Sequence, residues 1–243
     1  MGKDLFIGLD PGQTNQGLAV IDIDLHILKL VDTGVKIPKS VRGKNQPDIV
    51  RNSYVYYKTK AVIDEFGADS FKFCVMEGPN YSSKFNVTPI SIGSIHGQNQ
   101  MYFWDQNIDF AVLPPRTIQV GVHGTSADIT KQDTKNKMKE LFGDQIPDKG
   151  FTSNMSDALG MAYLARQFYL LLTGSVELTV GQQKIFLANT KTKNGRRGLV
   201  YNFGRRLFIF NGNGEMSIPK QGETLKDFYL RCKGEATDGT EIK

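Results

Sequence analysis

Leu5-Phe6-Ile7-Gly8-Leu9 is an apolar run that ends at Asp10-Pro11-Gly12. An apolar run closed by turn residues is typical of a β-strand, and here the strand ends on an acid. Two further strand-like segments follow at residues 17–23 and 28–37, with turn residues between them. Together the three segments predict an antiparallel meander at the start of the chain.

The rest of the first 175 residues alternates helices with strands. Periodic apolar positions and continuous apolar runs predict helices over residues 48–66, 89–106, 131–142 and 155–172, and strands over residues 71–76 and 110–113. A meander followed by alternating helices and strands predicts a mixed α/β sheet flanked by helices. The expected core positions of the first helix are Ile49, Val55, Ala61, Val62 and Phe66.

The character of the sequence changes after Gly174. Short strand-like segments separated by turns follow, at residues 176–180, 184–188, 199–203, 207–210 and 215–218. The 243-residue chain has a net charge of +5, and residues 176–243, with 12 basic and 7 acidic side chains, hold all of it. We therefore predict a body over residues 1–175 and a small basic β-rich extension over residues 176–243. A basic extension on a neutral body favours a polyanionic partner, although a merely solvated basic surface is an alternative.

Composition excludes several classes of protein. No apolar run approaches the roughly 18–20 residues that a membrane span needs. The N-terminus has no basic segment followed by a long apolar core, which a signal peptide would have. Two cysteines form neither a disulfide framework nor a cysteine-based zinc site. These features predict a soluble cytoplasmic protein with no membrane partner.

Two predicted strands end on acids, and the last predicted helix begins near a third. Asp10 and Glu77 follow apolar runs, and Asp157 lies in the first helical turn, with Asn154 three residues earlier on the same face. Each residue has a structural alternative, because Asp10 can open a turn and Asp157, Asn154 or Ser153 can cap a helix. Together, the acids could converge on Mg²⁺, which prefers oxygen ligands. Two such ions about 4 Å apart can activate a water and stabilise the leaving oxygen in phosphodiester cleavage.

An ordered set of motifs resembles a known family. The opening strand with Gly17 after it resembles that of RuvC-type Holliday junction resolvases, which belong to the RNase H-like superfamily. Val75-Met76-Glu77 resembles their second acidic strand, and Ser156-Asp157-Ala158-Leu159-Gly160-Met161-Ala162 resembles their final acidic helix. Between these, residues 112–115 with Val120-Gly121 resemble the next strand and turn, and residues 131–138 the lysine-bearing helix. The resemblance covers about residues 4–172, and the added extension is similar to phage-encoded versions of the family.

This resemblance implies an RNase H-like fold and a metal-dependent endonuclease, a crossover junction endodeoxyribonuclease. Such an enzyme nicks four-way junctions or other branched DNA symmetrically and leaves 5′-phosphate and 3′-hydroxyl ends. Asp10 would bridge two Mg²⁺ ions, with Mn²⁺ as an alternative, and Glu77 and Asp157 would complete the sites. Asn154 would assist, at a position where the family usually has an acid or His. Lys131 and Lys135 would contact phosphate or stabilise its developing charge.

The resemblance also implies the partners. Family enzymes act as twofold homodimers on branched DNA, and the helix over residues 89–106 would carry the dimer contact. Tyr81 and Phe85 follow Glu77 and could stack on an unpaired base, or simply pack. The compartment would be the bacterial cytoplasm or an infected host cell. Further DNA contacts are expected from the paired arginines of the extension, Arg196, Arg197, Arg205 and Arg206.

Two other functions stay open at this point. Residues 8–15 also resemble the first phosphate loop of actin-like and Hsp70-like ATPases, but no second glycine-rich loop or adenosine-binding glycine pair follows. A catalytically inactive junction-binding protein is the other alternative, supported by the neutral Asn154. A Ser/His/Asp mechanism has no support, because His26, His96 and His123 stand in no recognisable motif.

Overall fold

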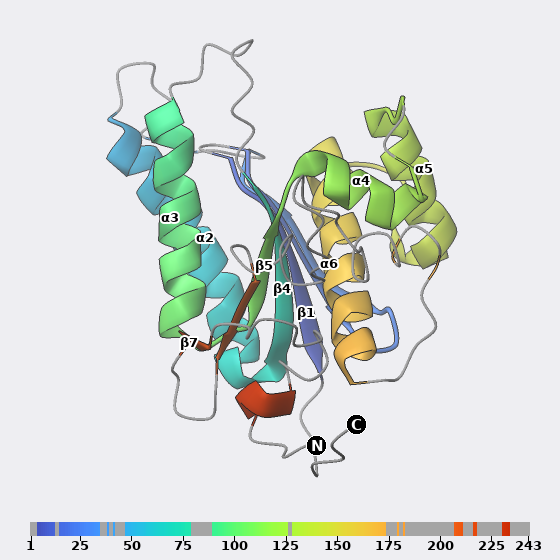
Figure 1. Cartoon of the computed structure of the whole chain (residues 1–243). Coiled ribbons are helices and arrows are strands. Elements are labelled where there is room, and N and C mark those ends of the chain that lie inside the picture. The colour runs from blue at the N-terminus through green and yellow to red at the C-terminus, as the bar shows by residue number, and fades with distance from the viewer. Residues whose placement is uncertain are drawn as a thin grey trace, which may run out of the picture.

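A mixed sheet with helices on both faces forms the body of the protein (Figure 1). The computed structural model describes residues 4–12, 15–34, 38, 41, 47–78, 89–125, 128–173, 179, 182, 207–210, 216–217 and 230–233. The strands are β1 Leu5–Asp10, β2 Gly17–Asp22, β3 Ile27–Asp32, β4 Phe71–Glu77, β5 Phe110–Leu113, β6 Leu207–Phe210 and β7 Met216–Ser217. The helices are α2 Asp48–Phe66, α3 Pro89–Asp105, α4 Pro115–His123, α5 Lys131–Phe142 and α6 Ser153–Leu172, with short 3-10 turns η1 Ala68–Ser70 and η2 Gly143–Gln145.

The strand order across the sheet is β3-β2-β1-β4-β5-β6-β7. The first three strands form the predicted antiparallel meander, and β1, β4 and β5 run parallel. Figure 1 shows α2 and α3 on one face of the sheet and α4, α5 and α6 on the other. The mixed α/β sheet flanked by helices is confirmed. Among the described helices, none has the length and apolar character needed to cross a bilayer.

Alternation along the strands divides the core between the two faces. Phe6 and Phe73 pack on the α6 face, whereas Ile7 and Cys74 pack under α2 and α3. On the α6 face Gly8 has no side chain, and a Cβ there would overlap the backbone of α6 at Ala158. Glycine at this position therefore allows α6 to lie directly on β1.

Several sequence predictions need correction. The third strand ends at Asp32, five residues before the predicted end, because a turn follows at Thr33-Gly34. Residues Val120-Gly121 lie inside α4 rather than in a turn, since Pro115 at the first helical position suits a helix start. In α2, Ile49 and Ala61 are exposed rather than buried.

The buried stripe of α2 contains polar residues, which explains the error. Asn52 and Thr59 take inner positions alongside Val55 and Val62. Thr59 Oγ1 accepts a 2.5 Å hydrogen bond from the side chain of Gln16, which is itself buried. Because Thr59 finds a partner inside the protein, it can occupy a position that the sequence assigns to an apolar residue.

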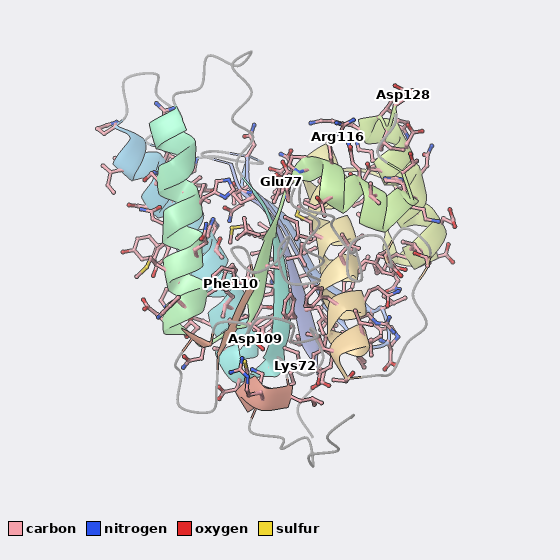
Figure 2. All side chains as sticks on the ribbon, viewed as in Figure 1. Lys72, Glu77, Asp109, Phe110, Arg116 and Asp128 are labelled. Atoms are coloured by element: carbon pink, nitrogen blue, oxygen red, sulfur yellow. The ribbon has the colours of Figure 1, made fainter. Side chains whose placement is uncertain are left out.

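The described parts of the extension lie on the body. β6 pairs antiparallel with β5, with Phe208 opposite Phe110, and residues 207–210 are therefore a strand as predicted. Cys232 is buried in the core on the α6 face, and Lys233 Nζ lies 2.7 Å from Asp109 Oδ2. Figure 2 places Asp109 at the end of the sheet opposite Glu77. Of the strands predicted at residues 176–180, 184–188 and 199–203, only residue 179 is described, and the boundary at residue 175 lies outside the described residues.

We predict that Lys233→Met lowers the free energy of unfolding by about 1–2 kcal/mol. The Asp109 side chain is only 2% exposed, and removing its cationic partner leaves a charge in a poorly solvated position. Lys72→Met is the matched control, because Lys72 and Asp4 are 3.5 Å apart and both 37% exposed, so its effect should stay below about 0.5 kcal/mol. Urea denaturation measures both. Equal effects of the two substitutions would contradict the docking of residues 230–233 on the body.

Candidate active site

Asp10 and Glu77 lie side by side at one end of the sheet. β1 and β4 are parallel neighbours with Leu9 opposite Met76, so the two strands end together. Asp10 follows Phe6 by four residues on β1, and Glu77 follows Phe73 by four residues on β4. Since side chains alternate along a strand, each acid points to the same face of the sheet as that phenylalanine. Both acids therefore project toward the α6 face. The expectation that two strand-end acids emerge together is confirmed.

The start of α6 brings Asp157 to the same end of the sheet. Thr152 is the N-cap of this helix, and its Oγ1 accepts a 3.2 Å hydrogen bond from the Met155 amide. The alternative that Asn154 or Ser153 caps the helix is therefore wrong. Gly17 lies beneath the first turn, and a Cβ at this position would overlap the backbone of Asn154. The missing side chain allows the N-terminal turn of α6 to approach the sheet.

Burial, and to a lesser extent neighbouring charge, perturbs all three acids. Burial raises the pKa of Asp10 well above its usual value, and the charges of Glu77, Asp157 and Asp32 raise it further. Burial and the Asp157 charge raise the pKa of Glu77 to about 7, against the opposing effect of Lys131. Burial also raises the pKa of Asp157, opposed by Lys131 and Lys135. Such mutually perturbed carboxylates are typical of functional sites.

A cleft of about 280 Å³ collects these groups. Asp10, Glu77, Asp157 and Lys131 all line it. Lys131 is the first residue of α5, whose N-terminus is held by a reciprocal capping box between Thr130 and Asp133. The structure thus brings four of the predicted catalytic residues together, and Lys135 acts on Asp157 from the same helix. Their catalytic and metal-binding roles stay predictions.

Two residues near the acids were not predicted from the sequence. Asp32 ends β3 and contacts Asn154. His123 lines the cleft at the end of α4, 3.4 Å from the Thr134 hydroxyl, and burial lowers the pKa of its imidazole. A helix prediction over residues 115–123 could have indicated that His123 faces α5. The other predicted DNA contacts, at Tyr81, Phe85, Arg196, Arg197, Arg205 and Arg206, lie outside the described residues.

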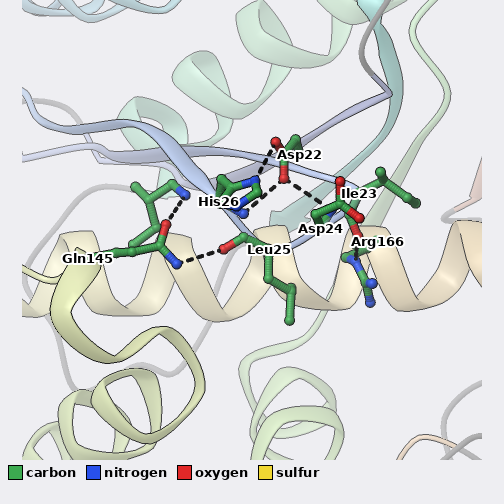
Figure 3. A network of polar contacts seen from close by, with 8 residues as sticks. Asp22, Ile23, Asp24, Leu25, His26, Gln145 and Arg166 are labelled. Carbon is green, nitrogen blue, oxygen red and sulfur yellow. Dashed lines mark hydrogen bonds and ion pairs between the residues drawn. The ribbon is translucent and has the colours of Figure 1, made fainter.

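A second acidic group, in the β2–β3 hairpin, has a structural explanation. Within the described part of the chain, Asp22, Asp24 and His26 place ligand atoms within 4.8 Å of one another; the three cleft acids do not form so close a group. Figure 3 shows Asp22 Oδ1 accepting from the backbone amides of Asp24 and His26, and Asp22 Oδ2 contacting the His26 ring at 2.9 Å. Gln145 also holds the hairpin through Leu25 and Ile27. This group closes a turn at the opposite end of β2 from Gly17.

The fold and the acidic cleft together define an RNase H-like protein. The β3-β2-β1-β4-β5 order, with α6 across β1 and acids at the strand ends, matches the fold that the sequence resemblance implies. A family model described as "Crossover junction endodeoxyribonuclease RuvC" matches residues 6–164. The chain therefore belongs to the RuvC family of crossover junction endodeoxyribonucleases, a family of metal-binding nucleases.

Solved structures have the same fold. The RuvC structure from Thermus thermophilus is 16% identical, with a TM-score of 0.55, and the match covers 72% of this chain and 99% of that chain. The T. thermophilus RuvC in complex with Holliday junction substrate is 15% identical, with a TM-score of 0.54 and the same coverage. Among curated proteins, a sequence search finds no match. The family match leaves the ATPase alternative without support.

Proposed function

We propose that this protein is a metal-dependent endonuclease that nicks four-way junctions, or other branched DNA, symmetrically. The observation that carries this proposal is the convergence of Asp10, Glu77 and Asp157 from two strands and one helix in a single cleft. Holding three ionised acids in this cleft is costly, because burial raises the pKa of each and neighbouring carboxylates add to the rise for Asp10 and Glu77. A divalent cation would relieve that cost. The Thermus thermophilus protein solved with a Holliday junction substrate supports branched DNA as the substrate.

The donor set fits Mg²⁺ or Mn²⁺. Carboxylate oxygens are the ligands that these hard cations prefer, and the cleft offers them from three different elements. We assign the ligand role for two ions to Asp10, Glu77 and Asp157, with Asn154 beside them. Bound ions of this kind supply positive charge that activates water and stabilises the leaving oxygen during cleavage to 5′-phosphate and 3′-hydroxyl ends.

The protein's own groups position the substrate. Lys131 on the cleft wall and Lys135 one turn along α5 present ammonium groups where a phosphate would lie against the acids. In this site they hold the phosphate and oppose the charge that develops on its oxygens. At pH 8 Glu77 is mostly ionised, since its pKa is about 7, and is available as a ligand.

A homodimer would place two such clefts on one junction. The exposed apolar side chains of α3 support this helix as the contact, because Met101 is 60% and Trp104 37% exposed. Tyr56, Met101 and Tyr102 line a hollow of about 450 Å³ between α2 and α3. Apolar surface of this kind is enriched at interfaces between subunits.

The arginines of the extension give a salt-dependence prediction. Changing Arg196, Arg197, Arg205 and Arg206 to Ala should weaken junction binding and lower the slope of log K against log salt by about one for each lost phosphate contact. Fluorescence anisotropy at several salt concentrations measures the slope. Substitution is cleaner than truncation at residue 175, because truncation also removes β6 and Cys232 from the body. An unchanged slope would assign these arginines to a solvated surface.

A nicking assay on a synthetic four-way junction tests the proposed function. We expect paired nicks at symmetric positions with Mg²⁺ and none with EDTA. Tight binding without nicking at any Mg²⁺ or Mn²⁺ concentration would instead favour a catalytically inactive junction-binding protein. Nicking of linear duplex at the same rate would contradict specificity for branched DNA.

A further inference from the structure

Asp32 makes contacts that tie it to the start of α6. Its Oδ2 accepts hydrogen bonds from the Thr152 hydroxyl at 2.7 Å and from the Asn154 amide at 3.1 Å. Its Oδ1 accepts from the backbone amide of Gly34 at 2.8 Å. The residue is buried, although it carries a carboxylate. Asp32 and Asn154 are 122 residues apart in the chain, so the sheet and helix, rather than local sequence, bring them together.

The sheet register places Asp32 in one row with Asp10. Asp10 pairs with Gly17 on β2, and Gly17 pairs with Asp32 on β3. Residues in one row of a sheet point to the same face, and two strand spacings separate their Cα atoms by roughly 10 Å. Gly17 lies between the two acids, and the backbone of Asn154 occupies the space that a side chain there would fill. Asp32 is also one of the charges that raise the pKa of Asp10, after burial, Glu77 and Asp157.

Asn154 lies between Asp32 and the cleft acids, and its hydrogen bond to Asp32 fixes the orientation of its side-chain amide. Its NH₂ group donates to Asp32, so its carbonyl oxygen is the end left for a cation. Asn154 and Asp157 are three residues apart on α6 and therefore lie on the same face of the helix. A carbonyl oxygen can bind Mg²⁺ or Mn²⁺, but it brings no net charge. Asp32 has that charge and lies in hydrogen-bond contact.

We propose that Asp32 is a positioning residue of the metal site, which orients the Asn154 carbonyl toward the acids and supplies the negative charge that Asn154 lacks. The pair Asp32–Asn154 then replaces a single acidic side chain at the position of Asn154. A carboxylate that hydrogen-bonds a metal ligand orients it and increases metal affinity, and its loss typically weakens binding 10- to 100-fold. This inference rests on the proposed function, because it assumes that the cleft acids bind a divalent cation.

Metal binding without DNA is the direct test. We expect Asp32→Asn to weaken Mn²⁺ binding, measured by EPR of free Mn²⁺, at least about tenfold. Asparagine keeps an oxygen that can accept from Thr152, so the helix cap survives. In the Asp32→Asn background, Asn154→Asp should restore Mn²⁺ affinity to within about threefold, because it returns the carboxylate to the neighbouring position. Asp69→Asn is the matched control, since it removes an exposed carboxylate from η1, at the opposite end of β4 from Glu77, and it should leave the affinity unchanged.

A purely structural role gives a different pattern. If Asp32→Asn lowers the melting temperature of the metal-free protein but leaves the Mn²⁺ affinity unchanged, the proposal is overturned. Failure of Asn154→Asp to restore affinity in a double variant that folds also overturns it. The proposed function is tested separately on the wild-type protein. It fails if the wild type shows no nicking and if its Mn²⁺ binding is absent or is the same in Asp10→Asn. If the wild type nicks junctions and Asp32→Asn binds Mn²⁺ as tightly as the wild type, only the role of Asp32 is rejected.

Discussion

Asp10→Asn, Glu77→Gln and Asp157→Asn should each lower the rate of junction nicking by roughly a thousandfold or more, with little change in junction binding. Each substitution removes a negative charge from the cleft while keeping the shape of the side chain. Losing one preorganised electrostatic group at a reacting centre typically costs about 10²- to 10³-fold in rate, and groups that act as a unit cost more. Affinity for DNA depends on Lys and Arg contacts to phosphate, which these substitutions leave intact. Single-turnover nicking and anisotropy binding measure the two quantities.

Glu140→Gln provides the control for this comparison. Glu140 lies on α5, as Lys131 and Lys135 do, but its side chain is 66% exposed and pairs with Lys137 at 2.6 Å. Its substitution changes the net charge equally and should leave nicking within about twofold of wild type. Full nicking by any one of the three cleft variants, at ordinary Mg²⁺ concentrations, would remove that residue from the site. Loss of binding in parallel with nicking would indicate a structural role instead.

The cleft acids could be predicted because their sequence signals are local. Asp10 and Glu77 each follow an apolar run, and an apolar run bounded by turn residues predicts where a strand ends. Parallel pairing of β1 and β4 then places both strand ends at one edge. Asp157 lies near the start of a helix whose apolar residues are unmistakable. The order of these three signals along the chain also carried the resemblance to the family.

Asp32 could not be predicted in the same way. The sequence places it inside a strand expected to run to residue 37, where an acid has no evident role. Its contact with Asn154 depends on two strand registers and on the close approach of α6 over Gly17. None of these is encoded within a short window. The pairing of β6 with β5 is likewise a long-range event that the strand pattern of the extension does not specify.

Glu77→Gln should also change stability, with a definite dependence on pH. In the metal-free folded protein the pKa of Glu77 is about 7, against 4.5 for the unfolded chain. Below pH 4.5 both states are protonated, and the carboxyl group adds no pH dependence. Between pH 4.5 and 7 the unfolded state ionises first, so the wild-type protein loses stability as the pH rises, and above pH 7 the loss is complete. The shift corresponds to about 3 kcal/mol.

Glutamine has the shape of the protonated acid and does not titrate, so Glu77→Gln should escape this loss. In EDTA at pH 8 we expect the variant to exceed the wild-type free energy of unfolding by about 3 kcal/mol, and the difference should vanish near pH 4.5. Saturating Mg²⁺ should reduce the difference at pH 8, because a ligand that binds only the folded wild type stabilises it. Glu140→Gln, at its exposed position on α5, should show no such pH dependence. Urea denaturation across this pH range measures both effects. A difference independent of pH would mean that Glu77 is not held in a buried, acidic position. A difference that Mg²⁺ leaves unchanged would mean that Glu77 does not bind the cation.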